Sequence, residues 1–146
     1  PQPIFDAIKR DGYYFRANGW WCGQWMTDES LKIMGLTRDE AMVMPDFTGC
    51  CMGIDTQHPQ AMAWFDKWFY HATSGAFVGD WNNRQKQCSP DVRCMGHRHD
   101  QVIGSVIFNQ MGMKFNEDDL FQYAPRNWPN CDEQLRKNIV FINLGV

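Results

Sequence analysis

The chain has 146 residues, of which 44% are hydrophobic and 21% are charged, and its formal net charge is −3. This length and balance exclude a disordered chain and favour one globular domain with its own core. Acidic and basic residues are interspersed, which excludes the basic surface that a nucleic-acid-binding protein needs. No apolar run reaches the roughly 20 residues that span a bilayer.

The first part of the chain predicts short helices joined by turns. Residues 3–10 carry apolar side chains at helical spacing, and residues 13–15 follow as a strand. Residues 18–26 are rich in Gly and Trp and predict a loop. Thr27 and Thr37 each precede acidic residues, a pattern typical of the N-caps of two short helices.

The middle of the chain predicts one strand and the longest helix. Residues 47–54 form an apolar run with small residues, which predicts a buried strand. Pro59 starts a helix that continues to about residue 71. The side chains expected on its buried face are Ala61, Met62, Phe65, Trp68 and Phe69. Residues 74–95 then form a long loop, a length typical of functional or disordered segments.

The last elements are a helix over residues 99–111 and strands over residues 113–115 and 138–144. Helices and strands interleave without the regular alternation of a complete doubly wound sheet. We therefore predict an α/β fold, a mixed sheet flanked by helices, as a single domain over residues 1–146.

A polar cluster, Gly96-His97-Arg98-His99-Asp100-Gln101, precedes the apolar part of the 99–111 helix. A helix N-terminus offers free N–H groups and a partial positive charge, so polar side chains gathered there can meet a phosphate, a sugar hydroxyl or a metal. Asp100 is also a good N-cap residue, so simple capping explains it equally well. Both histidines could be ordinary loop residues.

Other groups of candidate functional residues give weaker signals. Cys88, Cys94, His97 and His99 are possible zinc ligands, but their spacing is not that of a structural zinc site, and one histidine completing a catalytic metal site is favoured. Neither Gly-x-Ser-x-Gly nor a phosphate-binding glycine loop occurs. The six cysteines match no disulfide framework, so we expect reduced thiols and a cytoplasmic protein.

Tryptophans are frequent in this chain, and several fall in loop-like sequence. Trp20 and Trp81 are candidates for stacking on sugar rings, with core packing as the alternative.

The His97-Arg98-His99-Asp100-Gln101 motif, running into an apolar helix, resembles the late part of a nucleotide-sugar glycosyltransferase of the GT-A type. The opening Pro-Ile-Phe-Asp-Ala-Ile stretch with Gly-Tyr-Tyr-Phe resembles the segment after the metal-binding Asp-x-Asp of such enzymes. Residues 47–55 and the helix from Pro59 resemble their acceptor-side strand and helix. The resemblance covers most of residues 1–115 and implies the acceptor-side half of a GT-A fold.

This resemblance implies transfer of a sugar from a nucleoside diphosphate sugar to a hydroxyl of a glycan or another acceptor, with Mn²⁺ or Mg²⁺ at the leaving diphosphate. It implies that Asp100 acts as base or orients the acceptor, with Gln101 and His99 as further catalytic residues. The substrate-binding residues that it implies are Arg98, Asp55, Asp80, Trp20 and Trp81. His97 would complete the metal shell.

Two departures qualify the resemblance. The chain has no Asp-x-Asp segment, and its Gly-poor N-terminal part lacks the nucleotide-binding βαβ half of such enzymes. The resemblance therefore implies the C-terminal part of a longer transferase or a truncated relative of one, and the missing Asp-x-Asp leaves the activity of the isolated chain open. Two alternatives stay open. One is a non-catalytic module that binds a carbohydrate or a protein. The other is a structural domain of a larger assembly, whose apolar surface would favour self-association or docking to the missing half.

Overall fold

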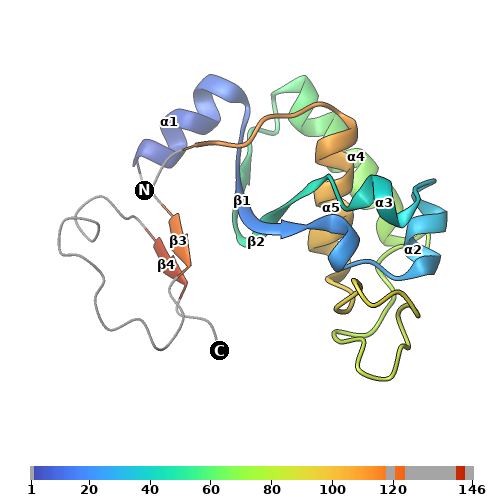
Figure 1. The fold of residues 1–146 in the computed structure, drawn as a ribbon. Coiled ribbons are helices and arrows are strands. Elements are labelled where there is room, and N and C mark those ends of the chain that lie inside the picture. The colour runs from blue at the N-terminus through green and yellow to red at the C-terminus, as the bar shows by residue number, and fades with distance from the viewer. Residues whose placement is uncertain (1, 118–120, 124–140, 144–146) are drawn as a thin grey trace, which may run out of the picture.

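The computed structural model describes residues 2–117, 121–123 and 141–143. In that part the helices are α1 (Gln2–Asp11), the 3-10 helix η1 (Cys22–Gln24), α2 (Asp28–Ile33), α3 (Arg38–Ala41), α4 (Pro59–Ala72) and α5 (His99–Gln110). The strands are β1 (Tyr13–Trp21), β2 (Pro45–Ile54), β3 (Phe121–Tyr123) and β4 (Phe141–Asn143) (Figure 1). None of these helices is both long and apolar enough to cross a bilayer.

The strands of the described residues form two separate sheets. β1 and β2 pair antiparallel, with Tyr13 opposite Ile54 and Trp21 opposite Pro45, and the register shifts on both sides of Ala17. β3 and β4 pair parallel. The predicted α/β fold is confirmed, but the single mixed sheet is wrong, because the antiparallel and parallel pairs are not joined. α5 packs on β2, α4 packs on α5, and α1 packs on β1 (Figure 1).

An aromatic cluster forms the centre of the main core. The Phe15 ring, from β1, lies between 4.9 and 5.1 Å from the ring centroids of Phe47, Trp64 and Phe108. These four side chains come from β1, β2, α4 and α5, and all are buried. Burial of each such side chain contributes about 2–3 kcal/mol, so this cluster holds the strand pair against the two long helices.

The predicted N-caps of α2 and α3 are confirmed. The Thr27 hydroxyl accepts a hydrogen bond from the Ser30 amide at 2.9 Å. The Thr37 hydroxyl accepts from the Glu40 amide at 3.3 Å, and the Glu40 carboxylate accepts from the Thr37 amide at 2.7 Å. Both helices therefore begin where the Thr-acidic pattern indicates.

On α4 the predicted buried face is only partly correct. Trp64 is buried and Trp68 is half-buried, whereas Phe69 is 65% exposed, so its predicted place in the core is wrong. The Trp68 indole occupies the position next to α5, where its N–H donates to the Asp100 carbonyl at 2.9 Å. Phe69 lies beyond that contact and stacks on Phe65 instead.

Several predicted strand boundaries also change. The loop predicted at 18–26 is wrong, because β1 continues to Trp21 and η1 follows directly. The strand predicted at 47–54 forms, but only Asp46, Phe47 and Thr48 of β2 are buried, since α5 covers that end alone. The predicted strand 138–144 contains β4, and its remaining residues lie outside the described ones.

Residues 113–115 do not form the predicted strand. The segment instead runs past the start of β1 and is held there by individual hydrogen bonds. The Lys114 amide donates to the Tyr13 hydroxyl at 3.1 Å. The Asn116 side chain accepts from the Phe15 amide, and the Asn116 amide donates to the Phe15 carbonyl, both at 2.8 Å. One asparagine therefore takes the place of a strand partner.

Arg38 is the polar anchor of the corner formed by η1, α2 and α3. It is 8% exposed, and its guanidinium donates to the carbonyls of Gly23 at 2.5 Å and Met26 at 2.7 Å and to the Asp28 carboxylate at 2.6 Å. Because these groups lie at the turn before α2, Arg38 fixes the direction in which the chain leaves β1.

Replacing Arg38→Met should lower the free energy of unfolding by about 2–3 kcal/mol, because buried carbonyls lose a charged donor. Urea denaturation measures this loss. The matched control is Arg93→Met, since Arg93 is exposed and pairs with Asp39 and Asp91 on the surface. That variant should unfold at nearly the wild-type urea concentration. Equal losses in the two variants would contradict the anchor.

Candidate functional site

The start of α5 differs from the other helix starts. Arg98 occupies the cap position, two residues before the predicted cap residue Asp100, and no side chain caps the helix. His99 follows with a φ of 47°, in the left-handed region. Asp100 lies in the first turn with an exposed side chain that has no hydrogen-bond partner among the described residues. Simple capping therefore does not account for Asp100.

The long loop before α5 is confirmed and is well anchored. The Cys88 carbonyl accepts from the Asp28 amide at 3.1 Å, which ties the middle of the loop to α2. The Met95 amide donates to the Gln24 carbonyl at 2.8 Å, which ties its end to η1. The loop is thus held against the corner that Arg38 organises.

This anchoring brings the two ends of the loop together. The His97 amide donates to the Asp80 carbonyl at 2.8 Å. At Gly96 the backbone passes so close to the Trp81 carbonyl that any Cβ at residue 96 would collide with it. Asp80 and Trp81 consequently lie beside the His97–Gln101 segment, although sixteen or more residues separate them along the chain.

Aromatic and cationic side chains form a continuous stack at this place, which we call the indole–arginine stack; its members are Trp20, Trp25, Arg98, Trp81 and His99. The Arg98 guanidinium carbon lies 4.0 Å from the Trp25 ring centroid and 5.1 Å from that of Trp81. Trp20 meets Trp25 edge-on at 5.7 Å, and Trp81 stacks on His99 at 6.0 Å. Trp20 is 40% and Trp81 61% exposed.

The Arg98 guanidinium contacts aromatic rings but has no hydrogen-bond partner among the described residues. The Trp25 and Trp81 indoles lie against its guanidinium, and each such contact is worth about 0.5–2 kcal/mol. The side chain makes no hydrogen bond to any described residue, and Nε is buried without a partner. A planar N–H edge of this kind matches a carboxylate or a phosphate in bidentate geometry.

Asp46, at the start of β2, forms a buried network next to the stack. Its Oδ2 accepts from the amide groups of Asn18 and Gln101, both at 2.6 Å, and its Oδ1 lies 2.6 Å from the Ser105 hydroxyl. Burial raises the pKa of Asp46, and the three hydrogen bonds and the charge of Arg98 oppose that rise. A carboxylate is thereby held inside the protein by neutral donors.

His97 belongs to the interior. It is fully buried, Nε2 lies 3.0 Å from the Ala76 carbonyl, and its ring meets that of His99 edge-on at 5.3 Å. Burial, and secondly the charge of His99, lower the pKa of His97 to about 4. Within residues 2–117, no three His, Cys, Asp or Glu side chains come close enough together to hold a metal ion. The metal role predicted for His97 stays a prediction.

The structure places Asp55 away from the other candidates. Asp55 follows the far end of β2, where its amide donates to the Gly12 carbonyl and its carboxylate accepts from the Gln57 amide, both at 2.8 Å. Asp46 lies at the start of β2, whereas Asp55 comes directly after the other end of this strand. The substrate-binding residue predicted at 55 therefore does not share a site with Arg98.

The remaining predicted residues come together around the start of α5: Trp20, Asp80, Trp81, His97, Arg98, His99, Asp100 and Gln101. Sequence reasoning missed Asn18, Trp25 and Asp46. For Asp46 a signal existed, because a lone carboxylate inside an apolar strand requires buried partners. Nothing in the sequence distinguishes Trp25 from its neighbouring tryptophans.

The cysteines add no ligand set to this site. The five that the structure describes are free thiols, and Cys131 lies outside the described residues. Burial raises the pKa values of Cys88 and Cys94. Both thiols lie close to backbone carbonyls, Cys88 at 3.2 Å from Asp80 and Cys94 at 3.3 Å from Met26. These contacts give the two thiols a packing role in the loop.

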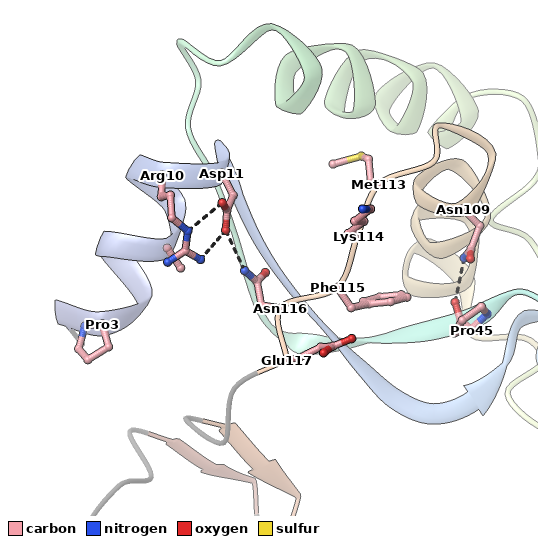
Figure 2. A pocket seen from close by; sticks show the side chains of 11 residues that line it. Pro3, Arg10, Asp11, Pro45, Asn109, Met113, Lys114, Phe115, Asn116 and Glu117 are labelled. Atoms are coloured by element: carbon pink, nitrogen blue, oxygen red, sulfur yellow. Dashed lines mark hydrogen bonds and ion pairs between the residues drawn. The ribbon is translucent and has the colours of Figure 1, made fainter.

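An open groove of about 820 Å³ lies between α1 and residues 113–117 (Figure 2). Within it the Asp11 carboxylate accepts from Arg10 at 2.6 Å and from Asn116 at 3.3 Å. None of the predicted site residues lines this groove. The candidate site is therefore the surface around the indole–arginine stack.

No protein family, curated protein or solved structure matches this chain.

The buried imidazole predicts an acid-sensitive fold. The pKa of His97 is lowered to about 4 from 6.5, so its neutral form stabilises the native state fully above pH 6.5 and this contribution is lost as pH falls towards 4. At about 1.4 kcal/mol per pH unit, the loss reaches about 3 kcal/mol. Urea denaturation at a series of pH values measures it.

His97→Gln should flatten that part of the pH profile, because glutamine does not titrate. The control is His99→Gln, which leaves the buried imidazole in place and should keep most of the acid-dependent loss, because burial is the larger cause of the lowered His97 pKa. An unchanged profile in the His97 variant would assign the acid sensitivity to other groups.

Proposed function

We propose that this chain is the acceptor-side part of an enzyme that transfers a sugar from a nucleoside diphosphate sugar to a hydroxyl group. The observation that carries the proposal is Arg98, whose guanidinium lies against the Trp25 and Trp81 indoles and makes no hydrogen bond to any described residue. A diphosphate supplies the anionic oxygens that the N–H edge of a guanidinium fits. The exposed indoles of Trp20 and Trp81 supply faces for a ring of the ligand.

Asp100 supplies the basic group of the proposed reaction. Its carboxylate is exposed and unpartnered among the described residues, two positions from the Arg98 edge. In the transfer, the acceptor oxygen forms a bond to the anomeric carbon while the bond from that carbon to the diphosphate breaks. The hydroxyl proton passes to the Asp100 carboxylate, and the diphosphate leaves with the bonding electron pair beside Arg98.

The predicted divalent metal would neutralise the leaving diphosphate when bound. The part of the chain that the structure describes contains no cluster of three potential ligands, so these residues alone do not fit that ion. The roles proposed for Arg98 and Asp100 do not depend on a bound metal.

The direct test is a thermal-shift panel of UDP, GDP, CDP and their sugar conjugates, with and without Mn²⁺. A ligand at about 100 times its dissociation constant stabilises the fold by about 2.7 kcal/mol, which shifts the unfolding temperature visibly. We expect one nucleotide to give a shift that Arg98→Gln abolishes. Arg84→Gln, in the exposed part of the same loop, is the matched control and should keep the shift.

Asp100→Asn should abolish transfer and leave the unfolding temperature close to that of the wild type, because the side chain is exposed and unpartnered among the described residues. Release of nucleoside diphosphate in the presence of the acceptor measures the turnover. Asp66→Asn, an exposed carboxylate on α4, is the control and should keep full activity. Unchanged turnover in the Asp100 variant would remove Asp100 from the mechanism.

A second candidate is a carbohydrate-binding module without catalysis, favoured by the exposure of Trp20 and Trp81. Such a module would bind free glycans and ignore nucleotides. A panel in which glycans shift the unfolding temperature and no nucleotide does would select it over the transferase.

A further inference from the structure

The hydrogen bonds around the β1–β2 pair show which backbone groups face away from the partner strand. In an antiparallel pair, residues that bond each other alternate with residues whose N–H and C=O groups point outward. The Asp55 amide donates to the Gly12 carbonyl at 2.8 Å, so these two residues bond each other just beyond the paired strands. The Phe15 amide and carbonyl instead bond Asn116, so the backbone groups of Phe15 point away from β2.

The register places two residues of β2 in outward positions. Met52 is paired with Phe15 and Ile54 with Tyr13, and Gly53 lies between them in the position that bonds β1. The N–H and C=O groups of Met52 and Ile54 therefore point away from β1. No hydrogen bond joins these four groups to any residue in the described part of the chain.

At the first half of β2, side chains of α5 bond the strand backbone. The Phe47 amide donates to the Ser105 hydroxyl at 2.9 Å, and the Pro45 carbonyl accepts from the Asn109 side chain at 2.9 Å. Helix side chains thus take the place of a neighbouring strand there. Residues 51–54 lie beyond these bonds, and we call them the open edge of β2.

The open edge carries no charge and no proline, the residues that commonly keep strand edges unpaired. Its sequence is Cys-Met-Gly-Ile, and the Met52 side chain is 41% exposed. The edge is also regular, because both register shifts of the pair lie beyond Phe15. A pair of two strands is marginal by itself, and additional strands stabilise it. The open edge therefore suits the addition of a strand.

We propose that the open edge of β2 pairs antiparallel with the open edge of a second copy of this chain, about a two-fold axis at Gly53. With that axis, Met52 pairs with Ile54 of the partner subunit, and Ile54 pairs with Met52 of the partner subunit. Each pair exchanges two hydrogen bonds, so every outward group of both subunits gains a partner. The open edge is thus its own complement. This pairing does not depend on the proposed function.

The same axis avoids the contacts that would oppose pairing. Gly53 faces Gly53 of the partner subunit at the closely spaced position of the ladder, where the absence of side chains removes any clash. Asp55, the charged residue next to the open edge, lies opposite Cys51 of the partner subunit, so like charges do not face each other. The exposed Met52 side chain becomes covered, and the two strand pairs become one sheet of four strands.

Sedimentation equilibrium measures this association. A contact made by one strand edge lies at the small end of specific interfaces, so we expect a dimer with a dissociation constant in the micromolar range. Met52→Pro removes one outward N–H and none of the bonds to β1, so it should weaken the dimer about tenfold or more. Met52→Lys should weaken the dimer similarly, because it places a charge on the edge while the backbone N–H stays.

Val92→Lys is the matched control, because Val92 is 91% exposed in the loop before α5 and lies outside the open edge. This variant should keep the dissociation constant of the wild type. A wild-type chain that stays monomeric up to millimolar concentration would overturn the inference. Dimers that persist unchanged in both Met52 variants would overturn it as well.

Hydrogen exchange at rising protein concentration tests the register. The Met52 and Ile54 amides should exchange more slowly as the dimer forms, whereas the Gly53 amide, which bonds β1, should exchange slowly at every concentration. Fast exchange of Met52 and Ile54 in a dimeric sample would assign the dimer to another surface and overturn the inference. Neither measurement requires a nucleotide, so failure of the proposed function leaves both results interpretable.

Discussion

The carboxylate of Asp46 is the constraint on which the other features of this protein depend. A buried charge is costly unless it is hydrogen-bonded, and each of its three donors comes from a different place: Asn18 on β1, and Gln101 and Ser105 on successive turns of α5. Satisfying that charge fixes how the strand pair approaches the helix. Phe47, the next residue of β2, belongs to the aromatic core, and Gln101 lies three positions after Arg98 of the indole–arginine stack.

The site is built on anchored backbone rather than on free loops. Arg38 holds the corner that carries Trp25, and the loop that carries Trp81 is bonded to α2 and to η1. Arg98 can stay against two indoles only because both are held in this way. Placement of this kind suits recognition, since little side-chain freedom is left to lose when a ligand binds.

Local signals in the sequence predicted much of the fold. Thr27 and Thr37 identified two helix starts, because capping depends on neighbouring residues alone. Phe69 and the end of β1 were not predictable, because both depend on which part of an element another element covers. Of the site, the motif at residues 97–101 was visible in the sequence. Asp46 and Trp25 join it only through the tertiary fold, and Asp55 lies apart from it because spacing does not show which end of a strand faces the site.

The left-handed backbone at His99 has a consequence for the evolution of this chain. A residue other than glycine at a φ of 47° costs stability, of order 1 kcal/mol, and glycine would relieve that cost. Yet glycine would remove the imidazole that stacks on Trp81 and lies 3.1 Å from the Phe77 carbonyl. Selection for a more stable fold and selection for an ordered stack therefore oppose each other at this residue. At His99 the chain therefore gives up backbone stability for two side-chain contacts that order the stack.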